Sequence, residues 1–347
     1  MNAKQLAAFA LVAAAFAPVC GAQVTSPNQV TTSAKLRVVG IAPVRDLSAG
    51  AIIPALVAGI KAVPGIGRVD VMRTIGQASV ATPRDNGIPY QGGPIIDDAN
   101  GVNVYYIWYG DWSKDTAAQT ILTDFIKNLG GSPYFNINTT YYDYEVGPNG
   151  TNVVKDLVVN SVHYMGSTND NYSLGKRLSD NDVGLVAQNA ILDGRLPLDY
   201  NGVYFVITSA DVTETSGFCT AYCAFHGYQG SGPFPNQVVA FIGNIDQCPS
   251  VCTAQPALPT PNNNVGADGM VSAIAHELEE SVTDPLATSW TFPDQTENAD
   301  LCAFTYGAFY RIPNGSYANM KLGDHQYLIQ QNWVNKNGGY CALRWDD

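Results

Sequence analysis

The sequence has few charged residues, and basic residues are the scarcer kind. Asp, Glu, Lys and Arg make up 14% of its 347 residues, whereas an ordinary soluble domain has about 25%. With 18 Lys and Arg against 30 Asp and Glu, the formal net charge is −12. Nucleic-acid binding needs clustered basic side chains to neutralise phosphates, so this composition argues against a nucleic-acid partner.

Long hydrophobic runs and several well-known active-site motifs are also missing. After residue 22 no apolar run approaches the roughly 20 residues that a membrane-spanning helix needs. The chain has no dinucleotide fingerprint, no phosphate-binding Gly-rich loop and no Gly-x-Ser-x-Gly turn. Hydrophobic residues make up 46%, too many for a disordered chain. We therefore expect a folded protein that has no membrane span after maturation and no nucleotide or serine-hydrolase chemistry.

The first 22 residues have the pattern of a secretory signal peptide. Lys4 supplies the positive start, an apolar run follows over residues 6–19, and small residues lie at 20–22. This pattern predicts cleavage after Ala22 and export of the mature chain. An uncleaved anchor is one alternative, but the apolar run is short for a membrane span. A lipid-modified Cys20 is another, but the preceding Pro18-Val19 fits a lipoprotein signal poorly.

Six cysteines remain after cleavage, and an even number in an exported chain indicates three disulfides. Cleavage also leaves 17 basic and 30 acidic residues, a net charge of −13. We predict bonds between the two Cys-x-x-x-Cys pairs and a third bond from Cys302 to Cys341. A zinc cluster built from the two pairs is the alternative, but export favours oxidation. The two pairs are Cys219 with Cys223 and Cys248 with Cys252.

Four Asn-x-Ser/Thr sequons mark expected surface sites of glycosylation, provided that the source organism glycosylates its exported proteins. They begin at Asn138, Asn149, Asn171 and Asn314.

We divide the mature chain into an N-terminal extension, residues 23–89, and a main domain, residues 90–347. The extension is punctuated by Pro and Gly and contains one expected strand at 35–42 and an apolar stretch at 51–63. Its looser composition would also suit a propeptide, although no cleavage signal marks its end.

Strands and helices alternate along the main domain. β-branched and aromatic runs predict strands, and apolar residues at helical spacing predict helices. The segment 217–232, which bears the first cysteine pair, is expected to be a loop. This alternation predicts a mixed α/β (α+β) domain held together by disulfides. The expected elements are strands at 102–109, 202–208 and 237–243, and helices at 115–129, 182–192 and 268–283.

The third predicted helix carries the sharpest chemical signal, the sequence His276-Glu277-Leu278-Glu279-Glu280. His276 and Glu280 are four residues apart and so lie on one face of a helix, where both could bind one divalent metal ion. Glu277 lies beside them, where a general base could reach a water on the metal. The spacing is that of the His-Glu-x-x-His zinc peptidases, with Glu280 in place of the second histidine. This substitution gives a harder ligand set and widens the choice of metal beyond zinc.

Further acids could complete such a site. Glu297 is expected to be the third ligand, and Asp300 is expected to orient His276, although the two could exchange these roles. Asp284 lies another four residues along the helix from Glu280. His226, in the expected loop, is a weaker candidate. Residues 276–300 contain seven acids and no Lys or Arg, so a bound cation would neutralise part of this charge.

Each of these residues could instead have a structural or solvent-facing role. Glutamates on a helix often face solvent, and His276 could be another surface residue. His163 and His325 are isolated and are expected to be structural. The aromatic residues over 105–112 fit a core better than a carbohydrate platform, and no spacing singles out a glycosidase acid pair.

Over roughly residues 90–302 the chain resembles the Exordium (phosphate-induced) protein family. The resemblance starts with Tyr-Gln-Gly-Gly-Pro at 90–94 and reaches Thr-Asp-Pro at 283–285. It includes Cys-Ala-Phe-His-Gly at 223–227 and Gly-Ala-Asp-Gly-Met at 266–270. Further similar segments lie at 104–110, 173–176, 208–212, 217–219, 243–244, 248–249 and 252.

The resemblance implies a protein of the extracellular space or cell wall. Plant members are associated with growth and cell expansion, and no biochemical activity is firmly attached to them. Plant members generally lack the His-Glu-x-x-Glu stretch, so this chain looks like the microbial, fungal or oomycete relatives that have it together with Glu-Asn-Ala-Asp-x-Cys. The plant growth role therefore transfers poorly.

Two functions remain open from the sequence. One is a secreted metal-dependent hydrolase of zincin-like type that uses a divalent metal, with zinc as the first choice, and acts on an extracellular peptide or a cell-wall polymer. The other is a non-catalytic extracellular protein that binds wall material or a partner. An exported storage or virulence factor with a dead site is a third reading that the sequence does not test.

Overall fold

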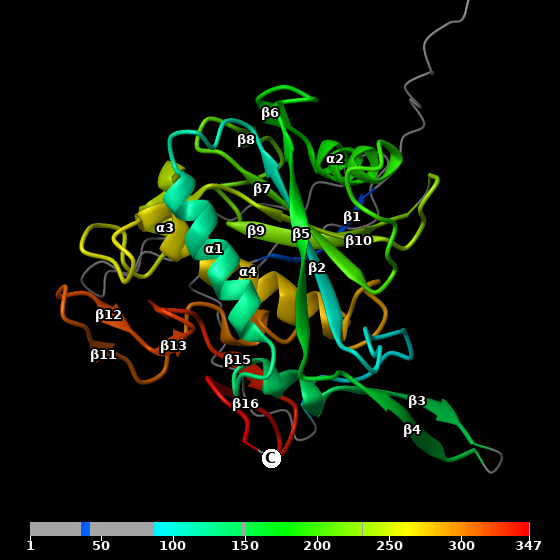
Figure 1. Ribbon diagram of the computed structural model, residues 1–347. Coiled ribbons are helices and arrows are strands. Elements are labelled where there is room, and N and C mark those ends of the chain that lie inside the picture. Colours follow the sequence, from blue (N-terminus) through cyan, green and yellow to red (C-terminus); the bar gives the residue numbers. More distant parts are fainter. Residues whose placement is uncertain (1–35, 42–86, 148–149, 231, 347) are drawn as a thin grey trace, which may run out of the picture. The chain divides into compact units, whose positions relative to one another are not determined.

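The structure is a computed structural model that describes residues 36–41, 87–147, 150–230 and 232–346 (Figure 1). The predicted signal peptide at 1–22 and the apolar stretch at 51–63 lie outside these residues.

A six-stranded mixed sheet forms the centre of the domain (Figure 1). The strand order is β1 (Leu36–Ile41), β9 (Ala224–Gln229), β10 (Val238–Ile242), β7 (Gly202–Thr208), β2 (Val102–Tyr109) and β5 (Val162–Asp170). Four neighbouring strands, β10, β7, β2 and β5, run parallel to one another, whereas β9 is antiparallel to both of its neighbours, β10 and β1.

Helices cover both faces of this sheet. α1 (Thr116–Leu129) and α4 (Val265–Thr283) pack on one face, where α4 contacts β9 and β10 and α1 contacts β5. α2 (Asp180–Leu192) packs on the other face against β7 and β10. Each face has its own core of buried apolar side chains. β7 and β10 are therefore buried on both faces and read as continuous apolar runs, Gly-Val-Tyr-Phe-Val-Ile-Thr and Val-Val-Ala-Phe-Ile.

Side-chain caps fix where the helices begin. Asp115 accepts a hydrogen bond from the Ala118 amide at the start of α1, and Ser179 and Asp182 form a capping box at the start of α2. Asn264 caps α4 by accepting from the Ala267 amide. This cap explains why α4 begins three residues before the predicted position 268.

The mixed α/β class and the predicted strands at 102–109, 202–208 and 237–243 are confirmed. The strand expected at 35–42 is β1, and it pairs with β9 in the central sheet. The prediction of a loop over 217–232 is wrong in part, because β9 occupies its second half. Two small residues, Ala224 and Gly227, interrupt the β-type pattern there and concealed the strand.

Short elements surround this core. β3 (Tyr142–Val146) and β4 (Asn152–Leu157) form a hairpin that projects from the body (Figure 1). The C-terminal part consists of three small antiparallel pairs, β11 (Tyr310–Arg311) with β12 (Tyr317–Ala318), β13 (Met320–Leu322) with β14 (His325–Tyr327), and β15 (Asn332–Val334) with β16 (Tyr340–Ala342). The remaining elements are β6 (Arg177–Leu178), β8 (Thr213–Glu214), α3 (Pro249–Cys252) and the 3-10 helices η3 (Phe135–Thr140), η4 (Ile245–Gln247) and η5 (Asp300–Cys302).

The predicted disulfide pairing is confirmed. Cys219 bonds Cys248 and Cys223 bonds Cys252, so each bond joins the segment before β9 to the segment before α4. The third bond joins Cys302 to Cys341. The alternative of a zinc cluster built from the first two pairs is therefore wrong.

The structure also tests two surface expectations. Asn138 is fully buried and its amide donates to the carbonyl of Phe135, so this sequon is not a surface acceptor. Asn171 is exposed, as expected. Within the described residues, no helix is both long enough and apolar enough to cross a bilayer.

Candidate metal centre

Helix α4 is buried on all sides, and this decides the status of its acids. Its residues from Gly266 to Thr283 are buried with the exception of Ser272. His276, Glu277 and Glu280 are each 0% exposed. The alternative that these side chains form a solvated helix face is therefore wrong.

His276 and Glu280 face each other one turn apart, as their spacing predicts. The His276 Nε2 lies 3.0 Å from Glu280 Oε1 and 3.5 Å from Asp300 Oδ1. On the other side of the ring, the side-chain amide of Gln330 lies 2.7 Å from His276 Nδ1. The Gln330 amide thus fixes the ring so that Nε2 points at the acids.

His226 reaches the same place from the sheet. It lies in β9, and its Nδ1 is 3.3 Å from Glu277 Oε2 and 3.5 Å from Glu280 Oε2. Its Nε2 is 3.8 Å from Glu297 Oε2. From the sequence His226 was only a weak candidate, because β9 was predicted to be part of a loop. In the structure His226 contacts three of the acids, Glu277, Glu280 and Glu297.

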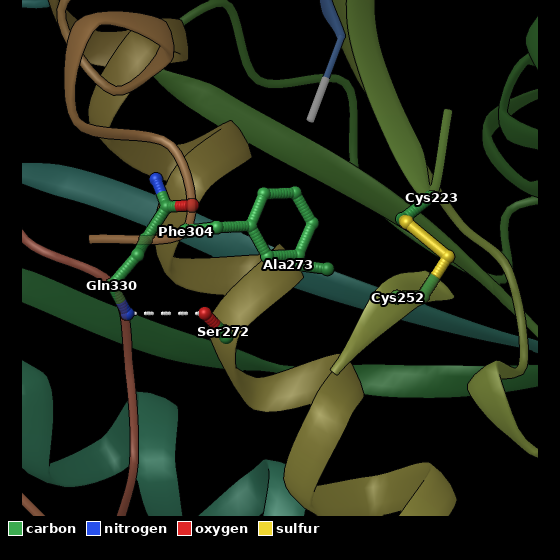
Figure 2. Close-up of a pocket in the computed structure, with 6 residues that line it drawn as sticks. All are labelled: Cys223, Cys252, Ser272, Ala273, Phe304 and Gln330. Carbon is green, nitrogen blue, oxygen red and sulfur yellow. Dashed lines mark hydrogen bonds between the residues drawn. A yellow bond between two sulfur atoms is a disulfide. The ribbon is translucent and has the colours of Figure 1, made fainter. Parts of the chain in front are cut away.

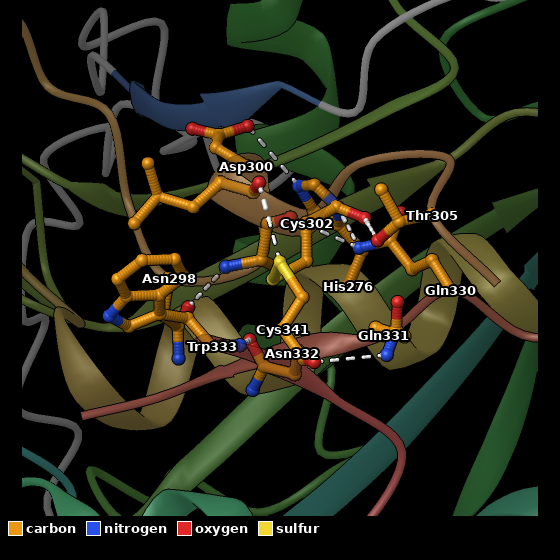
Figure 3. Close-up of a disulfide and its surroundings, with 12 residues drawn as sticks. His276, Asn298, Asp300, Cys302, Thr305, Gln330, Gln331, Asn332, Trp333 and Cys341 are labelled. Atoms are coloured by element: carbon orange, nitrogen blue, oxygen red, sulfur yellow. Dashed lines mark hydrogen bonds and ion pairs between the residues drawn. A yellow bond between two sulfur atoms is a disulfide. The ribbon is translucent and has the colours of Figure 1, made fainter. Parts of the chain in front are cut away.

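The segment after α4 brings in the remaining acids. The Asp300 amide donates to Glu280 Oε1 over 3.2 Å, and the Glu297 amide donates to Asp300 Oδ2 over 3.2 Å. Asp300 opens η5, which the Cys302–Cys341 disulfide ties to β16 close to His276 and Gln330 (Figure 3).

Asp284 is the C-cap residue of α4 and the last member of this group of side chains. Its Oδ1 accepts the amides of Thr288 and Ser289 over 2.7 Å each, and its carboxyl group lies within hydrogen-bonding reach of Glu297. We call the following seven residues the α4 cluster: His226, His276, Glu277, Glu280, Asp284, Glu297 and Asp300.

The α4 cluster is buried but leaves many polar atoms without partners. Six of its members are 0% exposed, and the Asp300 side chain is 5% exposed. A buried polar atom without a partner costs roughly 1–3 kcal/mol, and more when it is charged. Among the described residues, no Lys or Arg forms an ion pair with these acids. We call an atom of the cluster unpaired when it has no hydrogen-bond partner, even where an oppositely charged group is near. The unpaired atoms are Nε2 of His226 and of His276, Oε1 of Glu277, Oε2 of Glu280, Oδ2 of Asp284, both carboxylate oxygens of Glu297 and Oδ1 of Asp300.

Without a cation, protons must relieve this concentration of charge. Burial raises the pKa of Glu277 to about 8 and raises the pKa of Glu297 well above its usual value. Burial acts to lower the pKa of His226, but the carboxylates of Glu277 and Glu280 outweigh it and raise this pKa to about 9. A group of acids and imidazoles that holds extra protons at neutral pH is well suited to exchange them for a metal ion.

The spacing of the ligand atoms fits a metal ion. Two atoms that each lie about 2.1 Å from one cation are about 3.0–3.4 Å apart at octahedral to tetrahedral angles. The nitrogen–oxygen distances in the α4 cluster run from 3.0 to 3.8 Å. In two groups of three residues, one ligand atom from each residue lies within 4.8 Å of the other two. These groups are His226 with Glu280 and Glu297, and His276 with Glu277 and Glu280. Imidazole and carboxylate ligands suit zinc, manganese or iron.

The sequence did not predict the role of two buried positions near the α4 cluster, Gln330 and Glu279. Gln330, which orients His276, lies 54 residues away in a segment between short strands and carries no local signal. It also lines a small cavity of about 10 Å³, enough for about one water, together with Cys223, Cys252, Ser272, Ala273 and Phe304 (Figure 2).

Glu279 is the second missed position. It is fully buried on another side of α4, where the side-chain amide of Asn332 donates to it. It therefore belongs to the packing of the helix and not to the α4 cluster.

The other predicted residues lie outside the α4 cluster. His325 pairs with Asp124 over 2.7 Å, and His163 contacts the carbonyl of Asn100 over 2.7 Å. Both are structural, as expected. The aromatic side chains of β2 are buried in the two cores, so they form no carbohydrate platform.

Comparisons with known proteins place this chain in a family. The family model described as the phosphate-induced protein 1 conserved region matches residues 88–338. EXORDIUM-like 5 of Arabidopsis thaliana is 31% identical over 294 residues, covering 73% of this chain and 76% of the relative. EXORDIUM-like 3 of the same plant is 32% identical over 291 residues, covering 73% and 82%. PHOSPHATE-INDUCED 1 of Nicotiana tabacum is 27% identical over 288 residues, covering 75% and 85%.

No solved structure matches this chain. The family model covers well over half of the chain, including β2, β9, α4 and every residue of the α4 cluster. The chain belongs to the Exordium (phosphate-induced) protein family.

Proposed function

We propose that this protein is an extracellular member of the family whose α4 cluster binds a divalent metal ion. One observation carries the proposal: two imidazoles and five carboxylates converge in a buried site and leave eight side-chain atoms unpaired. A cation is the partner that suits unpaired nitrogen and oxygen lone pairs of this kind. Zinc remains the first choice, with manganese and iron also suited to the carboxylate-rich set.

The residues also suit a metal-dependent hydrolase, in line with the His-Glu-x-x-Glu pattern that we associate with a non-plant branch of the family. A bound cation would supply Lewis acidity. Glu277 has one oxygen near His226 and the other unpaired, so it is placed to take a proton from a water in the site. His226, whose Nδ1 lies 3.3 Å from the other oxygen of Glu277, would hold that proton in place. An extracellular peptide or a cell-wall polymer is the expected substrate.

A specific observation supports the second candidate, a non-catalytic extracellular protein with a structural metal. The side chains of the α4 cluster are almost completely buried. A groove of about 600 Å³ is lined by Pro285 and Leu286 next to Asp284, but by no member of the cluster. A substrate would need a conformational change to reach Glu277.

Metal analysis and enzyme assays on the same samples separate these readings. The full secreted chain should carry metal, His276→Ala should lose it, and Glu279→Gln, on the same helix but outside the cluster, should keep it. Equal and negligible metal in wild type and His276→Ala would overturn the metal proposal. Hydrolysis of peptide or wall-polymer substrates by wild type, lost in Glu277→Gln with metal retained, would support the hydrolase. Wall binding that survives both changes, without hydrolysis, would support the second candidate.

Export is part of the proposal. It is supported by the signal-peptide pattern over residues 1–22 and by three disulfides, which persist in oxidising compartments. Secretion of the full chain from a eukaryotic host, followed by N-terminal sequencing, should show a mature protein that begins at Gln23. Retention of the intact N-terminus in the cell would contradict it.

A further inference from the structure

We propose that the α4 cluster holds two divalent cations bridged by the carboxylate of Glu280. This inference rests on the proposed metal site, specifies its stoichiometry, and makes Glu277 a ligand of the second cation in place of the general base of a single-metal site. It is carried by the way in which the ligand atoms divide into two groups.

The two groups of mutually close ligand atoms share one residue. His226, Glu280 and Glu297 form the first, and His276, Glu277 and Glu280 form the second. The first group combines Glu280 with one residue of β9 and one residue of the segment after α4. All three residues of the second group lie in α4. Glu280 is the only member common to both.

The two oxygens of Glu280 point at different imidazoles. Oε1 lies 3.0 Å from His276 Nε2, and Oε2 lies 3.5 Å from His226 Nδ1. A carboxylate that binds a single cation directs one or both of its oxygens toward the other ligands of that cation. Here Oε1 lies next to the imidazole of the second group and Oε2 next to the imidazole of the first, which is the arrangement of a bridge. The two groups also meet at Glu277, whose Oε2 lies 3.3 Å from His226 Nδ1.

Each group has one further carboxylate at hand. Asp284 lies within hydrogen-bonding reach of Glu297 and has its Oδ2 unpaired. Asp300 Oδ1 is also unpaired and lies 3.5 Å from His276 Nε2. Each group therefore offers one imidazole and three carboxylates, with the Glu280 carboxylate shared between them.

The charge of the site favours two cations over one. The five carboxylates carry −5 when ionised, and no Lys or Arg of the described chain pairs with them. One divalent cation would leave −3 in a buried space, whereas two would leave −1. Paired metal ions about 3.5–4 Å apart are a common solution for such acid-rich sites in hydrolases.

Native mass spectrometry of the full disulfide-bonded chain, loaded with Mn²⁺ alone, tests the stoichiometry. We expect two ions per chain in wild type and in the control Glu279→Gln. Glu297→Gln and Glu277→Gln should each retain one ion, because each removes a ligand of one group only. Glu280→Gln should weaken both ions by at least about 100-fold. Thermal unfolding and free-thiol analysis of each variant confirm that it is folded.

Electron paramagnetic resonance provides a second measurement that needs no enzyme activity. Two Mn²⁺ ions bridged by one carboxylate are spin-coupled, so the fully loaded wild type should lack the six-line signal of isolated Mn²⁺. Glu297→Gln should show that six-line signal.

Three outcomes separate this inference from the proposal on which it rests. One ion in wild type that Glu277→Gln leaves in place would overturn the two-cation centre and keep the single-metal site with Glu277 as base. Two ions without spin coupling would overturn the Glu280 bridge. No bound ion in a folded wild type would overturn both proposals.

Discussion

Two groups of buried acids lie on opposite faces of the central sheet, and they differ in how their polar atoms are satisfied. The α4 cluster lies on the face covered by α1 and α4. On the face covered by α2, a second group consists of Asp180, Glu214 and Tyr222, which we call the α2 group. Asp180, Glu214 and Tyr222 are 2%, 5% and 3% exposed, so burial does not distinguish this group from the α4 cluster.

Hydrogen-bond donors do distinguish them. In the α2 group, Glu214 accepts from the amides of Ser216 and Gly217 over 2.7 and 3.2 Å and from the Tyr222 hydroxyl. None of the polar side-chain atoms of the α2 group is left buried without a partner. The protein therefore completes the α2 group by itself, whereas the α4 cluster leaves eight side-chain atoms without a hydrogen bond. In our proposal this contrast separates a structural network from a metal site.

Removing a disulfide should have the largest effect on the unfolding free energy. Its effect on metal affinity should depend on which of the two regions the disulfide lies next to. Cys302→Ser/Cys341→Ser should cost about 2–5 kcal/mol in unfolding free energy and should also weaken metal binding, because Asp300 lies in η5 with Cys302. Cys219→Ser/Cys248→Ser, next to the α2 group, should cost a similar amount and leave metal affinity within about twofold. Denaturant unfolding and metal titration of both variants check this. Equal loss of metal affinity in the two would contradict it.

Chelation should destabilise the protein through the α4 cluster alone. Ligand linkage is worth about 2.7 kcal/mol when the metal concentration is 100 times Kd, which corresponds to roughly 5–10 °C in Tm for a domain of this size. Calorimetry with and without EDTA should show this drop in wild type and in Glu214→Gln, but not in Glu280→Gln. A drop that persists in Glu280→Gln would place the metal elsewhere.

Tyr222→Phe should weaken the α2 group without any effect on metal. The change removes a hydroxyl that donates to the buried Glu214 carboxylate, which should cost about 1–3 kcal/mol. Chemical denaturation measures the loss, and metal titration of the same variant serves as the control. An unchanged unfolding free energy would show that the carboxylate finds another donor.

The α2 group should also make the stability of the protein depend on pH. Burial, and next the charge of Glu214, raise the pKa of Asp180 to about 7. The folded state then holds a proton that the unfolded state has released above about pH 4. Stability should therefore be highest below that pH and fall by at most about 1.4 kcal/mol per unit as the pH rises to about 7. Asp180→Asn should flatten this part of the profile. A wild-type stability that rises over this range relative to Asp180→Asn would contradict the sign.

Much of the fold could be predicted because its strands and helices carry clear local patterns. Strand β2 matches its aromatic and β-branched run from Val102 to Tyr109. The disulfides followed from the even cysteine number and the predicted export of the chain. Strand β5, with Gly166, Ser167 and Asn169 in its sequence, was missed because one of its faces is open and polar. Tertiary pairing with β2, not local propensity, makes it a strand.

The α4 cluster was predictable where its members lie close together in the sequence. Helical spacing placed His276 beside Glu280, and the scarcity of charge elsewhere made the acids of 276–300 conspicuous. His226 and Gln330 could not be ranked in the same way, because sheet register and a distant loop bring them to α4. The sequence also offered no means to tell that Glu279 faces Asn332 while its neighbours face the imidazoles. Such distinctions depend on the orientation of a fully buried helix, which has no amphipathic stripe to read.

Anomalous diffraction from crystals of the full chain grown with Mn²⁺ tests the central claim most directly. The α4 cluster should show anomalous density on both sides of the Glu280 carboxylate, next to His276 Nε2 on one side and next to His226 on the other. The α2 group in the same crystals should show none. An absence of anomalous density at the α4 cluster, with the acids and imidazoles in the arrangement described above, would contradict the claim that it is a metal centre.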